Sequence, residues 1–124
     1  MNKVTGGIIC TAQDKGRCHD FNLFKRSGTR LHPKTIALTD TGYLGLQKLH
    51  ADTQMPKKRS KHHPLTKDDK AANRVLSRNR VPCENVIGAL KRFKIIADRY
   101  RNRRKRFGLR FSLIAGLYNA NLAV

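Results

Sequence analysis

A short β-prone run that ends directly on an acidic residue is the feature that most limits what this chain can fold into. Residues Thr35–Thr39 form the run, and Asp40 follows at once, before the turn residues Thr41 and Gly42. A run of this length with turn residues behind it predicts a buried strand. Functional side chains gather where the strands of such sheets end, so Asp40 is a candidate functional carboxylate. Asp40 also fits the N-cap of a helix, and the residues alone leave these two interpretations equal.

The second half of the chain carries helix signals. Thr66 predicts an N-cap, with Asp68 and Asp69 in the first turn, where the helix dipole favours negative charge. We expect a long helical region from there, interrupted at Pro82, because proline removes an amide donor and can kink a helix.

Apolar residues then recur at helical spacing in two sets. From Val81 the first set consists of Ile87, Leu90, Phe93 or Lys94, and Ala97. The second set advances by steps of four, three and four, and consists of Phe107, Phe111, Ile114 and Tyr118. Each set predicts one helix face that packs on a core.

The start of the chain predicts a strand and a short helix. Ile8–Ala12 has the composition of the second strand of a hairpin whose first strand is nearly absent, so we expect the chain to begin within a larger unit. Asp20 is expected to cap a helix that ends near Gly28. Strands and helices together predict an α/β fold.

Residues 52–67 have the weakest structural signals and contain a strongly basic run at 57–63. Pro56 and Pro64 punctuate this stretch, which we interpret as an exposed basic loop. A nuclear-localisation signal is the weaker interpretation, because short basic runs are common in DNA-binding proteins.

Charge indicates the class of partner. The 124 residues include 27 Lys and Arg against 8 Asp and Glu, which gives a formal net charge of +19. Such a field attracts a polyanion, and nucleic acid is the leading candidate because phosphate neutralisation supplies most sequence-independent affinity. An anionic membrane surface is the weaker candidate, since no apolar stretch approaches the roughly 20 residues that cross a bilayer.

The sequence contains neither a recognisable targeting signal nor a cysteine pattern typical of disulfides or zinc sites. No signal peptide is visible, so we expect a cytoplasmic protein. Cys10, Cys18 and Cys83 form no Cys-x-x-Cys pair, and their spacing to His62-His63 matches no zinc pattern. We expect free thiols.

The most specific local pattern is Arg80, Glu84 and Lys91 within one expected helix. At the helical repeat these residues lie within about 60° of one another, so one face presents a carboxylate between two cations. The alternative is an ordinary surface salt bridge between Arg80 and Glu84, which contributes only a few tenths of a kcal/mol.

Three ordered blocks resemble one family. They are Asp40–Gly45, Asn73-Arg74, and Arg80-x3-Glu84-x6-Lys91, with supporting similarity at Gly16–Phe21, Ile87–Phe93 and Tyr100–Arg103. Together they resemble the C-terminal half of the catalytic domain of DDE-type bacterial insertion-sequence transposases, which are related to the Harbinger transposases.

This resemblance implies a partial RNase H-like fold, a mixed sheet with flanking helices, in which two aspartates and one glutamate bind Mg²⁺ or Mn²⁺. Asp40 would be the second acid and Glu84 the third, both catalytic and metal-binding. Arg80 and Lys91 would hold DNA. The implied partners are transposon ends and target DNA near the bacterial nucleoid.

By the same resemblance the first aspartate lies upstream, on a first strand that this chain lacks. The acids before Asp40 are Asp14 and Asp20, and neither matches the missing one. We therefore expect residues 1–124 to form a single truncated catalytic domain, helical over 68–121, and inactive alone. A truncated or frameshifted gene is the expected origin, with a separately encoded second half as the alternative. An exposed sheet edge would favour a homo-oligomer.

The expected DNA-binding residues are Arg80, Lys91, Arg99, Arg101, Arg103, Arg104, Lys105 and Arg106. A protein of another class, a small ribosomal or nucleoid-type nucleic-acid-binding protein without a catalytic role, has the same composition. Only the ordered blocks separate the two hypotheses.

Overall fold

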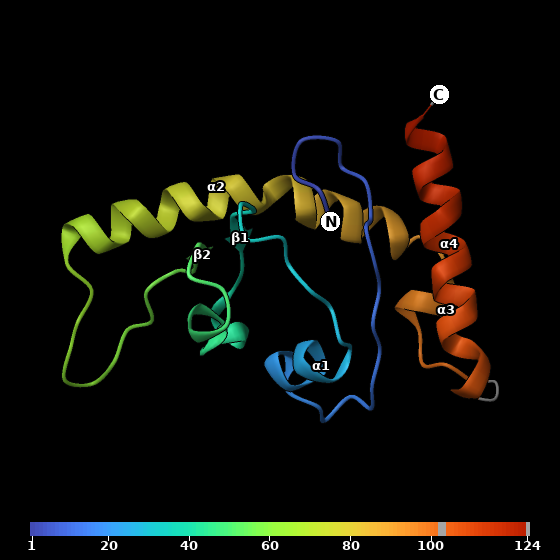
Figure 1. Cartoon of the computed structure of the whole chain (residues 1–124), viewed down its shortest axis with the longest axis horizontal. Coiled ribbons are helices and arrows are strands. Elements are labelled where there is room, and N and C mark those ends of the chain that lie inside the picture. Colours follow the sequence, from blue (N-terminus) through green and yellow to red (C-terminus); the bar gives the residue numbers. More distant parts are fainter. Residues whose placement is uncertain (102–103, 124) are drawn as a thin grey trace. The chain divides into compact units, whose positions relative to one another are not determined.

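The computed structural model describes residues 1–101 and 104–123. These residues form two compact units, one made of Asp14–Arg80 and the other of Met1–Gln13 with Val81–Val124. The described part combines a small parallel sheet with helices, which confirms a mixed α/β class (Figure 1). None of its helices is long and apolar enough to cross a bilayer.

The unit Asp14–Arg80 contains the sheet. Its elements in chain order are α1 (Asp20–Arg26), β1 (Ala37–Leu38), the 3-10 turns η1 (Thr41–Tyr43) and η2 (Leu46–Lys48), β2 (Thr53–Gln54) and the first part of α2 (Lys67–Leu90). The strand expected at Thr35–Thr39 is present as β1, which is shorter than expected. It pairs in parallel with β2, with Ala37 opposite Thr53 and Leu38 opposite Gln54. The connection between them, η1 and η2, therefore crosses over at the end of β1.

A small core fixes this crossover. Leu46 of η2 is only 2% exposed, and His50 and Thr53 are also buried. The His50 ring bonds the carbonyl of Thr35, and the Thr53 hydroxyl donates to the carbonyl of His50. The first bond ties the crossover to the segment just before β1, and the second ties it to the first residue of β2, so polar as well as apolar contacts hold the crossover beside both strands.

Helix α1 begins one residue earlier than its cap signal suggested. Asp20 is its first residue, His19 is the N-cap, and no side chain caps the helix. The expectation that Asp20 is the N-cap is therefore wrong. The end near Gly28 is confirmed, since Ser27 closes α1 and Gly28 follows with a positive φ of 67°.

Helix α2 runs without interruption through Pro82. The break expected there is wrong: proline removes one amide donor, and the neighbouring turns retain the helix. The start is as expected, because the Thr66 hydroxyl accepts from the Asp69 N–H at 3.1 Å and the Asp69 carboxylate accepts from the Thr66 N–H at 3.2 Å. This reciprocal cap has the form of a capping box.

The other unit contains the end of α2, then α3 (Lys94–Ala97), η3 (Arg104–Arg106) and α4 (Phe107–Leu122). Its buried apolar residues are Val86, Leu90, Ile114 and Ala115. Leu90 and Ile114 were expected in the core, whereas Ile87 and Phe93 are each 45% exposed and Val86 was missed. The helix expected to continue to Ala97 ends at Leu90, and a turn precedes α3.

The strand expected at Ile8–Ala12 does not form. A strand needs backbone partners, and the contact that Ile8 makes is instead with the side chain of Asn119 on α4. The Asn119 carboxamide accepts from the Ile8 N–H and donates to the Ile8 carbonyl, both at 2.8 Å. Ile9 stays 74% exposed.

Candidate active site

Asp40 lies two residues beyond the end of β1, where the crossover begins. Its backbone is extended, with φ −92° and ψ −178°, and it is the N-cap of η1. One carboxylate oxygen, Oδ1, accepts from the N–H of Gly42 at 2.9 Å. Both interpretations of this residue are therefore compatible: Asp40 lies at a strand end and also caps the following turn.

The second oxygen of Asp40 faces a cation. The distance from Oδ2 to an Arg80 guanidinium nitrogen is 3.9 Å, with 44% of the Asp40 side chain and 30% of the Arg80 side chain exposed. At that distance the contact is an ion pair and not a hydrogen bond. Arg80 was expected beside Glu84, and the ion pair the structure gives it is with Asp40. This oxygen keeps its lone pairs available to a further ligand.

A second carboxylate approaches the same turn. A Cβ atom added at Gly42 would lie 2.9 Å from Asp20 Oδ2 and 3.0 Å from Asp40 Oδ1. Only glycine therefore leaves both carboxylates in place. Asp20 reaches this point from the first turn of α1, which contacts η1.

Asp14 takes no part in this arrangement. Its carboxylate binds the Lys15 N–H at 2.7 Å and the Arg26 guanidinium at 2.8 Å. The Lys15 amide bond, the Cys18 thiol and Arg26 together hold the pKa of Asp14 below its ordinary value. Of the two acids upstream of Asp40, Asp20 is the one that reaches the Gly42 turn beside Asp40 Oδ1, and Asp14 is paired with Arg26.

The carboxylates at Gly42 suit a divalent cation in part. Hard cations such as Mg²⁺ require oxygen donors, and the carboxylate oxygens of Asp40 and Asp20 are of that kind. Across residues 1–101 and 104–123, however, no group of three or more Asp, Glu, His or Cys side chains is placed to bind one ion. The donor chemistry fits such an ion, although the donor set is incomplete.

Glu84 lies on α2, one helical turn beyond Arg80, and its side chain is exposed. Lys91 follows the last residue of the same helix, with its N–H bonded to the Ile87 carbonyl at 3.0 Å. All three residues of the sequence pattern are thus on or at the end of one helix, as expected. Glu84 belongs to the unit Val81–Val124, and Asp40 to the unit Asp14–Arg80.

The expected DNA-binding run lies between α3 and α4. Among the described residues of this run, the exposed cations are Arg99, Arg101, Arg104, Lys105 and Arg106. Arg103 lies outside the described residues. An aromatic cluster supports this segment: the Tyr100 and Phe107 rings meet edge to face at 4.9 Å, and the Arg110 guanidinium lies 5.8 Å from the Tyr100 ring centre. The cations of this run are thus adjacent in sequence to packed aromatic rings.

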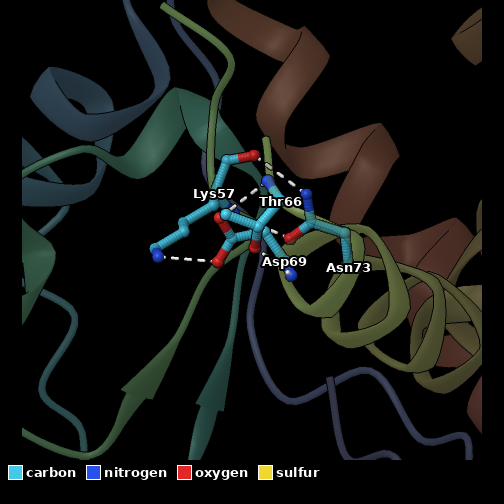
Figure 2. Close-up of polar contacts among 4 residues, drawn as sticks. All are labelled: Lys57, Thr66, Asp69 and Asn73. Atoms are coloured by element: carbon cyan, nitrogen blue, oxygen red, sulfur yellow. Dashed lines mark hydrogen bonds and ion pairs between the residues drawn. The ribbon is translucent and has the colours of Figure 1, made fainter. Parts of the chain in front are cut away.

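A polar cluster at the start of α2 was only partly foreseen (Figure 2). The Asn73 carboxamide accepts from the Lys57 N–H at 2.8 Å and donates to the Lys57 carbonyl at 2.9 Å. Asp69 accepts from the Lys57 ammonium at 2.7 Å, and this bond, with those from Thr66, holds the pKa of Asp69 below its ordinary value. Thr66 was predicted as the N-cap and Asp69 as a first-turn acid, whereas the bond from the Thr66 N–H to the Asp69 carboxylate was not predicted. The role of Asn73 was missed, because nothing local indicates a partner 16 positions away.

The chain belongs to the family of DDE superfamily endonucleases, whose profile matches residues 4–119. A protein of Microchaete diplosiphon described as "Probable transposase for insertion sequence element IS702" is 44% identical over 124 residues. That match covers 100% of this chain and 45% of the relative, so the chain spans less than half the length of that relative. No solved structure matches the chain significantly. Family membership confirms the resemblance read from the three blocks and disfavours the hypothesis of a small ribosomal or nucleoid-type protein.

Proposed function

We propose that this chain supplies the second and third metal-binding acids of an RNase H-like transposase domain that cleaves and joins DNA. The observation that carries the proposal is the placement of Asp40: it lies two residues beyond the end of β1 in the parallel sheet, its Oδ1 is used in a cap, and its Oδ2 is open beside Arg80. Such a carboxylate is positioned rigidly by the fold and still has an oxygen to offer. In the proposal Glu84 contributes the other acid from α2.

A pair of Mg²⁺ or Mn²⁺ ions, when bound, would activate the attacking oxygen and steady the leaving oxygen of a phosphodiester. The residues of this chain have simpler tasks. Asp40 and Glu84 supply hard oxygen ligands. The guanidinium of Arg80, which lies beside Asp40, can bind phosphate in two-point contacts.

DNA is the proposed partner, as transposon ends and as target. Its phosphates would contact Arg80, Lys91 and the exposed cations among residues 99–106, with Arg103 included by sequence. Contacts of this kind position a duplex without reading its sequence. A homo-oligomer and an association with the bacterial nucleoid belong to the same proposal.

The 124-residue chain alone is proposed to be inactive. Two carboxylates leave a pair of metal ions poorly held, and in-line attack depends on the alignment of the reacting groups. Asp20 lies near Asp40, but in the proposal it does not replace the first aspartate of the family. The chain alone would bind a divalent ion weakly.

Mn²⁺ binding measured by electron paramagnetic resonance tests whether Asp40 and Glu84 share an ion. We expect Asp40→Asn and Glu84→Gln each to weaken Mn²⁺ binding, and the double variant to weaken it by less than the two effects combined. Such non-additivity is what two ligands of one ion produce. Asp52→Asn is the control: Asp52 is an exposed aspartate just before β2, and its replacement should leave the affinity unchanged.

Purely additive losses would contradict a shared ion. Equal Mn²⁺ affinities in the unaltered chain, the two single variants and the double variant would contradict the site assignment altogether. Asp20→Asn serves as a further variant: a loss as large as that of Asp40→Asn would show that Asp20 is a ligand in this chain.

A further inference from the structure

A groove within the unit Asp14–Arg80 has a mixed lining that the proposed catalytic role does not use. Its cavity volume is about 810 Å³. The apolar part of the lining consists of Phe21, Leu44, Leu49, Met55 and Pro56. Leu44 and Leu49 are each 64% exposed. Large apolar side chains are thus presented to solvent in a hollow next to η1, the turn that Asp40 caps.

The charged part of the lining consists of four lysines, namely Lys25, Lys48, Lys57 and Lys58. None of the described residues that line the groove is acidic. The Lys25 ammonium lies 4.8 Å from the centre of the Phe21 ring, so charge and aromatic surface are adjacent. This combination favours an occupant that is anionic and also carries flat apolar faces.

The lysine side of the groove is held in place by the cluster of Figure 2. Asn73 pairs with both backbone polar groups of Lys57, and Asp69 binds its ammonium. These contacts fix the backbone of the segment Pro56–Lys58 to α2 before any ligand binds. The backbone at Lys58 therefore does not have to become ordered when a ligand enters the groove. Pre-ordering of this kind lowers the entropy lost on binding.

The positive surface continues beyond the groove. The exposed residues that follow Lys58 include Arg59, Lys61, His62 and His63. A turn orders them, because the Ser60 N–H donates to the His63 carbonyl at 3.2 Å and the His63 N–H donates to the Ser60 hydroxyl at 3.0 Å. A polyanion in the groove would meet further cations along the same segment.

We propose that this groove binds a single-stranded segment of DNA, with unstacked bases on its apolar lining and phosphates on its lysines. Proteins that bind single strands combine a positive groove with apolar and aromatic platforms, whereas a duplex keeps its bases stacked inside and offers mainly phosphates. The inference rests on the proposed function, since it assigns a second DNA surface to the same unit as Asp40.

Binding of two labelled DNAs with equal numbers of phosphates tests the inference by fluorescence anisotropy. One DNA is a blunt duplex, and the other carries a single-stranded overhang. We expect the chain to prefer the overhang, and Leu44→Ala with Leu49→Ala to weaken overhang binding about tenfold, because both truncations remove apolar contact with the bases, while blunt-duplex binding is unchanged. Lys48→Ala should lower the salt slope for the overhang by about 0.7, the value for one single-strand phosphate.

Two controls match these variants. Leu109→Ala removes a leucine that is 74% exposed on α4, and Lys34→Ala removes an exposed lysine outside the groove lining. Because Leu44 and Leu49 are mostly exposed, their replacement should leave the circular dichroism spectrum unchanged. Neither control should alter the preference for the overhang.

Equal affinity for both DNAs would overturn the groove proposal and leave the proposed function standing, because duplex binding through Arg80 and the residues beyond Arg99 does not need the groove. A preference that survives the leucine replacements would also overturn it. Absence of binding to either DNA would instead contradict the proposed function.

Discussion

The carboxylate of Asp40 divides its two oxygens between separate tasks. Oδ1 caps η1 through the Gly42 amide, and Oδ2 lies beside Arg80. From sequence, a strand-end functional acid and a helix cap were competing interpretations, because both follow from the same position. The structure shows why they do not conflict: a cap uses one oxygen and fixes the direction of the other. The cap thus contributes to holding the candidate ligand in one geometry.

Gly45 is the second residue on which this turn depends. Its φ is 103°, and a Cβ atom added there would lie 3.0 Å from Phe21 Cε1. We predict that Gly45→Ala destabilises the fold by about 1–3 kcal/mol, since an L side chain is strained at this φ and also crowds the ring. Urea unfolding followed by circular dichroism measures the loss.

Gly16→Ala is the matched control, because a Cβ there meets nothing within 4 Å and its φ is not positive. Gly28→Ala, with φ 67° and the same open space, separates the backbone strain from the contact with Phe21. If Gly45→Ala unfolded at the same urea concentration as Gly16→Ala, the strain argument would be wrong.

At the scale of elements, local signals predicted what depends on local chemistry. The cap at Thr66, the strand before Asp40 and the face of α4 that includes Ile114 were all predicted from spacing and residue type. The strand at Ile8–Ala12 was wrong because a strand requires a partner, and its composition could not reveal that Asn119 takes that place. Likewise, the apolar spacing could not decide between Val86 and Ile87, since tertiary packing selects the buried face.

The candidate site was predictable to a similar extent. The acid at the end of a strand and the charged residues of α2 followed from sequence. The ion pair between Arg80 and Asp40 did not, because it joins residues 40 positions apart through the crossover of the sheet. The approach of Asp20 to Gly42 was missed for the same reason.

Two asparagines perform the same structural task in the two units. Asn73 pairs with the backbone of Lys57, and Asn119 pairs with the backbone of Ile8, so each helix holds an extended segment by a side-chain amide. We predict that Asn73→Ala lowers the free energy of unfolding by about 1–2 kcal/mol, since each lost bond contributes about 0.5–1.5 kcal/mol. The amide of Lys57 should also exchange hydrogen with solvent faster.

Asn85→Ala, at an exposed position on the same helix, is the control for helix propensity. Hydrogen exchange measured by NMR distinguishes a local effect from a global one. Unchanged exchange at Lys57 in Asn73→Ala would contradict the anchoring role of Asn73.

At the scale of the whole molecule, positive charge is the dominant property. The formal net charge is +19, and both units carry exposed basic residues, within 57–63 in one and, among the described residues, within 99–101 and 104–106 in the other. The DNA partner proposed above would account for this excess, because DNA is a polyanion. The excess alone could not have separated such an enzyme from a small binding protein, whereas the ordered blocks around Asp40 and Glu84 did.

Duplex DNA binding should therefore depend steeply on salt and little on sequence. We predict that log K falls linearly with log salt, with a slope whose size is about 0.9 per phosphate neutralised. Arg101→Ala and Arg104→Ala should each reduce the size of that slope by about one. Anisotropy titrations at several salt concentrations with two unrelated duplexes measure both properties. A flat salt response would exclude the phosphate backbone as the main contact.

Nicking of supercoiled plasmid in the presence of Mg²⁺ tests the central claim, that Asp40 and Glu84 are the metal-binding acids of a DDE endonuclease, most directly. The assay compares the 124-residue chain with a chain extended upstream by a strand that carries the first aspartate. We predict nicking by the extended chain, its loss in the Asp40→Asn and Glu84→Gln variants of that chain, its retention in Asp52→Asn, and none by the 124-residue chain alone. Nicking by the extended chain that persists in Asp40→Asn or in Glu84→Gln would contradict the claim.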